Sequence, residues 1–116
     1  MQHRFGSHHD DPEFQELRRE FVREALQRTR EMAGILETCA GGPPRDEAGM
    51  RFRRIAHELR GAGGSYGFPI VTLYAGDAED GYLDAADPRS LAAIVGMLEG
   101  AVRQAGALVG IPDMPR

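Results

Sequence analysis

Apolar residues recur at three- and four-residue steps along most of the chain, which is the spacing of amphipathic helices. No stretch alternates between apolar and polar residues, as a half-buried strand does, for more than a few positions. No internal sequence repeat is visible. The pattern predicts an all-α protein with four helices, covering about residues 12–39, 46–67, 69–79 and 88–109.

The expected helices begin and end at residues that favour helix termini. Asp11 and Asp87 each place a capping carboxylate immediately before a proline, a residue suited to the first helical turn. Asp46 is the expected cap of the second helix, and Gly67 is its expected C-terminal glycine. The run Gly-Gly-Pro-Pro at 41–44 ends the first helix.

The length and composition fit a single globular domain. The chain has 116 residues, of which 41% are hydrophobic and 28% charged, enough for one core but not for two. Because the links between the helices are short, we expect an up-down-up-down four-helix bundle over residues 11–110. Residues 1–10 are expected to form a flexible N-terminal tail, and residues 111–116 a short C-terminal tail.

The charge balance and the apolar content exclude several functions. The net charge is −4, so general nucleic-acid binding, which depends on neutralising phosphates, is not expected. There is no run of about 18 apolar residues and no signal-peptide pattern, so we expect a cytoplasmic protein without a membrane segment. The single cysteine excludes an internal disulfide.

Acidic residues concentrate between the third and fourth expected helices, and their spacing differs from that of a Ca²⁺-binding loop. We interpret this segment as a solvated loop and expect no metal or cofactor site in the chain. Its acidic residues are Asp77, Glu79, Asp80, Asp84 and Asp87.

The strongest candidate site is centred on His57. At about 100° per residue, His57 points about 160° away from the apolar face of the second helix. Arg53, Arg60, Gly61 and Gly64 point to the same side. Because a glycine inside a helix costs about 1 kcal/mol relative to alanine, bare surface at these two glycines indicates a functional need.

Two chemistries do not fit this segment. The glycines lack the last Gly of G-x-G-x-x-G and follow a helix instead of a strand, and the chain has no lysine for a Walker motif. A metal site is also disfavoured, because His57 and its neighbour Glu58 diverge by about 100° around the helix.

Phosphoryl acceptance on His57 accounts for all of these residues together. A neutral imidazole has a free nucleophilic nitrogen near pH 7. The transferred group carries spread negative charge, which the neighbouring cations Arg53 and Arg60 can stabilise. Bare surface at Gly61 and Gly64 would let the active site of a partner close over the ring.

The segment from Ala56 to Gly67 resembles the motif of histidine-containing phosphotransfer (HPt) domains. That motif is His, any residue, Leu, Lys or Arg, Gly, and a further Gly ten positions after the His. Here these positions are held by His57, Leu59, Arg60, Gly61 and Gly67.

The resemblance implies a bacterial-type phosphorelay intermediate in two-component signalling. His57 would take a phosphoryl group from an aspartate of one response-regulator receiver domain and pass it to another, with Arg60 as the cation beside it and Gly61 providing clearance. The receiver would supply Mg²⁺ and most catalytic groups, so the chain would be a monomeric carrier and not itself an enzyme. A hybrid histidine kinase is a further implied partner.

Three alternatives stay open. The phosphoacceptor and dimerisation domain of sensor histidine kinases also begins with His-x-Leu-Arg, but it usually continues with Thr-Pro where this chain has Gly61 and Ala62. A helical adaptor that is never phosphorylated is a second alternative. The third is a solvated helix face, on which His57 is incidental and the arginines make intrahelical pairs such as Glu58 with Arg54.

Overall fold

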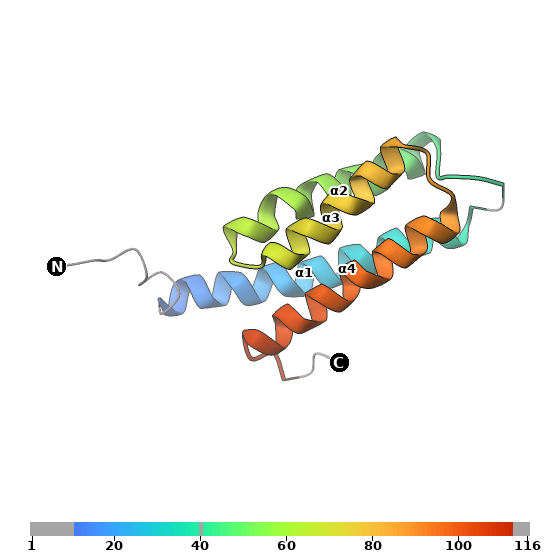
Figure 1. Ribbon diagram of the computed structural model, residues 1–116. Coiled ribbons are helices and arrows are strands. Elements are labelled where there is room, and N and C mark those ends of the chain that lie inside the picture. The colour runs from blue at the N-terminus through green and yellow to red at the C-terminus, as the bar shows by residue number, and fades with distance from the viewer. Residues whose placement is uncertain (1–10, 40, 113–116) are drawn as a thin grey trace.

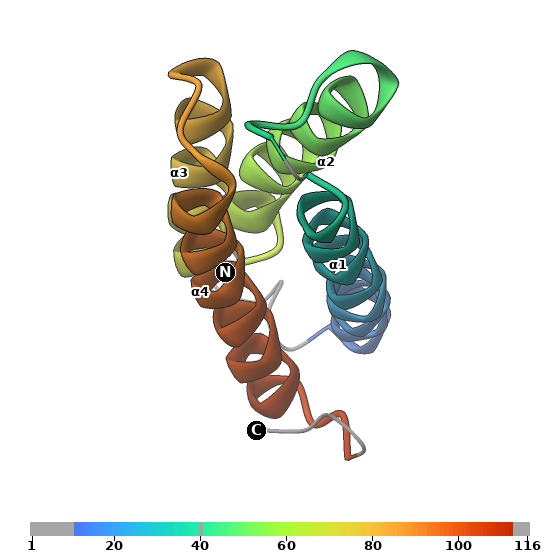
Figure 2. The same ribbon diagram turned by 90° about the vertical axis from the view of Figure 1, so that its right-hand side faces the viewer.

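The computed structural model describes residues 11–39 and 41–112 and contains four α-helices and no strand in these ranges. The predicted N-terminal tail, with His3, His8 and His9, lies outside the described residues. The all-α class with four helices is confirmed (Figures 1 and 2). The helices are α1 (Pro12–Glu37), α2 (Asp46–Ser65), α3 (Pro69–Leu83) and α4 (Pro88–Leu108).

The helices pack around one apolar core. Each helix contacts two others, because α1 and α3 both lie against α2 and also against α4. Phe52 and Ile55 of α2, Leu91 and Leu98 of α4 and Met32 of α1 are completely buried. The core extends one residue beyond the expected bundle, since the side chain of Ile111 is 5% exposed and packs into it.

Most of the expected helix termini are confirmed. The carboxylate of Asp11 accepts a hydrogen bond from the Glu13 amide at 3.0 Å, and Asp87 accepts one from the Ser90 amide at 2.8 Å. Gly67 follows α2 with a φ of 86°, a conformation that glycine adopts without strain.

Some boundaries of α1, α2 and α3 differ from those expected. Asp46 is the first residue of α2 and not its cap, because Arg45 holds the capping position and accepts the first backbone bond, from the Gly49 amide. Helix α1 ends at Glu37, two residues earlier than expected, with Thr38 as its cap. Helix α3 continues to Leu83.

The extension of α3 overturns the interpretation of the acidic segment as a solvated loop. Asp77, Glu79 and Asp80 are helical, and Glu79 is only 4% exposed. Aspartate and glycine disfavour helix interiors, yet this part of α3 packs against α2, where Arg53 and Arg60 offset its charge. A tertiary contact therefore overrides local propensity.

Helix α4 is long and apolar enough to cross a membrane by length and composition alone, with a mean hydropathy of 1.2 over 18 residues. The core helix of a bundle has the same property. In this fold α4 lies against α1 and α3 and contributes Leu91, Val95, Leu98 and Val102 to the core.

Two arginines of α1 bind the C-terminal ends of other helices. Arg18 Nε donates to the carbonyl of Tyr66 at 2.9 Å, and its guanidinium lies 4.6 Å from the centre of the Phe68 ring. Arg19 Nη1 donates to the carbonyl of Val109 at 3.2 Å. Cations at helix C-termini are favourable because the helix dipole is negative there. The Arg18 contacts position the turn that follows α2, and the Arg19 contact lies at the end of α4.

We expect the stability contributed by the α4 cap to depend on pH. The hydrogen bond from the Ser90 amide lowers the pKa of Asp87 below its ordinary value of 3.8. The cap contribution is therefore complete above pH 3.8 and is lost as the pH falls through the lower folded pKa. In urea unfolding between pH 2 and 6, an Asp87→Ala variant should be less stable than the wild type at pH 6. An equal difference at pH 2 would contradict this assignment.

Candidate functional site

Helix α2 presents His57 to solvent. The His57 side chain is 68% exposed, whereas Ile55 and Ala56 beside it are completely buried. Arg53, also predicted on this side of α2, is likewise exposed. The predicted orientation of the helix is thus confirmed: its apolar face packs into the core and the histidine lies on the opposite side.

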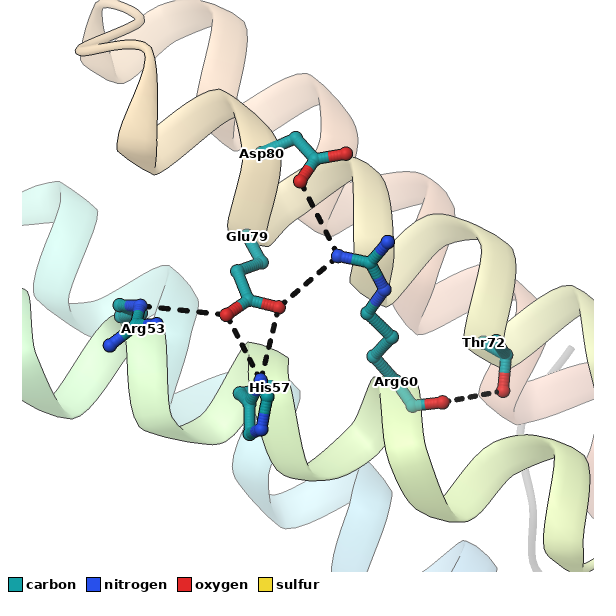
Figure 3. Close-up of polar contacts among 6 residues, drawn as sticks. All are labelled: Arg53, His57, Arg60, Thr72, Glu79 and Asp80. Atoms are coloured by element: carbon teal, nitrogen blue, oxygen red, sulfur yellow. Dashed lines mark hydrogen bonds and ion pairs between the residues drawn. The ribbon is translucent and has the colours of Figure 1, made fainter.

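The residue that organises the site is Glu79 of α3 (Figure 3). Its carboxylate is 5% exposed, and His57 Nδ1 lies 3.0 Å from Oε2 and 3.3 Å from Oε1. An ionised carboxylate can only accept a hydrogen bond, so Nδ1 must carry the proton. In the neutral ring the lone pair is then on Nε2, which points away from Glu79 (Figure 3).

Two arginines of α2 offset the charge of the buried carboxylate. Arg53 Nε lies 3.5 Å from Glu79 Oε2, and Arg60 Nη1 lies 3.3 Å from Oε1. Arg60 Nη1 is also 3.3 Å from Asp80 Oδ1. Buried charges persist in proteins when they are paired and hydrogen-bonded. These contacts account for the helical, buried position of Glu79.

The glycines near His57 fall into two kinds. A Cβ added at Gly61 would meet no atom within 4 Å, and one at Gly64 would lie 3.7 Å from Thr72 Oγ1, an ordinary contact. Packing within the chain therefore does not require either glycine. Gly63 differs, because its Cβ would lie 2.6 Å from Thr72 Oγ1. Gly63 lets α3 approach α2, while Gly61 and Gly64 leave exposed surface bare.

Two other charged residues of α2, Arg51 and Glu58, pair with residues of α1. Arg51 Nε binds Glu31 of α1 at 2.6 Å, and this bond lowers the pKa of Glu31. Glu58 bonds to Arg28 of α1 at 2.5 Å, so the intrahelical Glu58 to Arg54 pair is not seen.

Sequence reasoning missed Glu79 and Asp80 as members of the site. Glu79 lies 22 residues after His57, at the expected end of the third helix, in the acidic segment that was interpreted as a solvated loop. A signal was present, because Thr72, Gly76 and Glu79 follow one another at four- and three-residue steps and so share one face of a longer helix. Among the residues that the structure describes, no group of three or more His, Cys, Asp or Glu could hold a metal ion.

Comparison with known proteins adds no assignment. No protein-family model, no curated protein and no solved structure matches the chain.

Proposed function

We propose that this chain is a phosphorelay intermediate that accepts a phosphoryl group on His57 Nε2 from a receiver-domain aspartate and passes it to another receiver. One observation carries the proposal: Nδ1 of an exposed histidine lies 3.0 Å from a buried carboxylate. Because an ionised carboxylate only accepts, this contact favours the proton on Nδ1 and leaves Nε2 as a free nucleophile. The match of Leu59, Arg60, Gly61 and Gly67 to the HPt motif supports the same reading.

The phosphoryl transfer does not require a proton to leave the site. The Nε2 lone pair of His57 attacks phosphorus and forms the N–P bond, while the bond from phosphorus to the aspartyl oxygen breaks and its electron pair stays on the receiver carboxylate. The imidazole ring becomes positively charged, because Nδ1 keeps its proton. Glu79 lies against that proton and stabilises the charge, in the manner of a carboxylate that orients a reactive histidine. Reverse transfer regenerates the neutral ring.

We further propose that the four helices follow an up-down-up-down order and that the chain acts as a monomeric cytoplasmic carrier, as expected from the sequence. The partner receiver supplies Mg²⁺ and most catalytic groups. The bare surface at Gly61 and Gly64 lies on the same exposed side of α2 as His57 and gives the receiver access to the ring.

The test is transfer from a phosphorylated receiver domain in the presence of Mg²⁺. Trypsin cleaves after Arg54 and Arg60, so the peptide 55–60 contains His57 as its only histidine and excludes signal from the N-terminal histidines. We expect an acid-labile, base-stable phosphoryl group on this peptide by mass spectrometry at alkaline pH. A label absent with every receiver in a broad panel, while circular dichroism shows intact helices, would favour the adaptor. A stable symmetric dimer would favour the kinase dimerisation domain.

A further inference from the structure

The side chain of Arg60, a residue of α2, extends across the surface of α3. Its side chain passes over Gly76, where an added Cβ would lie 3.2 Å from Nε and 3.4 Å from Cζ. Its terminal nitrogen Nη1 then reaches both Glu79 and Asp80 at 3.3 Å (Figure 3). Gly76 thus provides the space in which the guanidinium rests on α3.

This position holds Arg60 on the wrong side of the ring for a phosphoryl group. Figure 3 shows the Glu79 carboxylate against Nδ1 of His57 and the Arg60 guanidinium on the same side, bound to Glu79 and Asp80, while Nε2 points the other way. A phosphoryl group on Nε2 would receive the guanidinium only after Arg60 left its present partners. Nη1 donates to Glu79 Oε1 and to Asp80 Oδ1 at 3.3 Å each, and both bonds are longer than the optimal 2.9 Å or so.

The two carboxylates that hold Arg60 differ in their other contacts. Glu79 is buried and also bonds His57 and Arg53. Asp80 is 62% exposed, and its one ion pair among the described residues is with Arg60. Removing the charge of Asp80 would therefore loosen Arg60 without disturbing the bond that orients the His57 ring.

We propose, on the basis of the phosphoryl-carrier function above, that Asp80 is a positioning residue that competes with the phosphoryl group on His57 for Arg60. In the resting chain Asp80 and Glu79 share Arg60. In the phosphorylated chain the guanidinium divides between Asp80 and the phosphoryl oxygens. Asp80 thereby limits how strongly the carrier holds its phosphoryl group, which favours onward transfer.

The experiment uses phosphoramidate as a chemical donor, so that it does not depend on a receiver. The full chain is phosphorylated, and the titration of the phosphoryl group on His57 is followed by ³¹P NMR. A His57→Gln variant identifies the signals of the other histidines. A guanidinium beside the phosphoryl group favours its dianion, so Asp80→Asn should raise the acid dissociation constant about threefold, the size expected for an exposed ion pair. The titration then moves about half a pH unit lower.

Two controls separate the effect of releasing Arg60 from the general effect of removing one negative charge. Asp77→Asn removes the same charge from an exposed position one turn earlier on α3 and should change the constant less than about 1.5-fold. In an Arg60→Gln background, Asp80→Asn should not change the acid dissociation constant further, because there is no guanidinium left for Asp80 to bind. Equal effects of Asp80→Asn and Asp77→Asn, or an Asp80→Asn effect that persists without Arg60, would overturn the proposal.

The experiments distinguish a failure of the proposed carrier function from a failure of the proposed role of Asp80. If no receiver phosphorylates the chain, the carrier role fails, while the titration of chemically phosphorylated His57 still decides whether Asp80 competes for Arg60. If receivers do phosphorylate the chain, Asp80→Asn should also shift the transfer equilibrium about threefold toward phosphorylated His57.

Discussion

A Glu79→Gln variant is expected to accept a phosphoryl group on His57 about 100-fold more slowly than the wild-type chain. In the wild type the carboxylate can only accept, which keeps the proton on Nδ1 of His57 and the lone pair on Nε2. An amide can also donate, so glutamine permits the tautomer in which Nε2 carries the proton and cannot attack. It also lacks the negative charge that stabilises the cationic ring.

The rate is measured by rapid quench with a phosphorylated receiver, and ¹⁵N NMR of the His57 ring reports the tautomer. Asp77→Asn, the same loss of one charge elsewhere on α3, should transfer at the wild-type rate, and His57→Gln defines zero transfer. If the transfer rate of Glu79→Gln is within twofold of the rate of Asp77→Asn, and the helices of Glu79→Gln are intact, then Glu79 does not activate His57.

Gly63→Ala is expected to destabilise the bundle by about 1–3 kcal/mol, the cost of forcing extra atoms into a packed contact. The added Cβ would lie 2.6 Å from Thr72 Oγ1, 2.9 Å from the Thr72 backbone nitrogen and 3.1 Å from the Phe68 carbonyl oxygen. Two of these atoms belong to the backbone, so a side-chain rotation cannot relieve the clash and α3 must move away from α2.

Gly61→Ala is the matched control, two residues earlier in the same helix. Its Cβ would meet nothing within 4 Å, so the substitution should stabilise the chain by up to about 1 kcal/mol through helix propensity. The free energies of unfolding are obtained from urea denaturation of the three proteins. If Gly63→Ala and Gly61→Ala change the free energy of unfolding in the same direction, close packing between α2 and α3 is not what distinguishes the two glycines.

Much of the fold was predictable because its signals are local. The three- and four-residue spacing of apolar residues fixes which face of each helix turns inward. Asp11, Asp87 and Gly67 mark termini through contacts with residues at most four positions away. The outward orientation of His57 follows from the same periodicity, since Ile55 and Ala56 must face the core.

The end of α3 was mispredicted because it depends on contacts distant in the sequence. The end of α3 lacks strong helix formers, and its acidic residues resemble a loop when only near neighbours are considered. In the folded chain the same residues lie against the arginines of α2. No local pattern shows that these opposite charges become neighbours.

The sequence by itself determined the four helices, the face of α2 that carries His57 and the bare surface at Gly61. Only the tertiary structure decided that Glu79 is buried against His57 Nδ1, that Asp80 shares Arg60, and that Arg18 binds the end of α2. The physical reason is that periodicity is a property of a single helix. The partner of a charged side chain, and the depth at which it is buried, depend on which helices pack together.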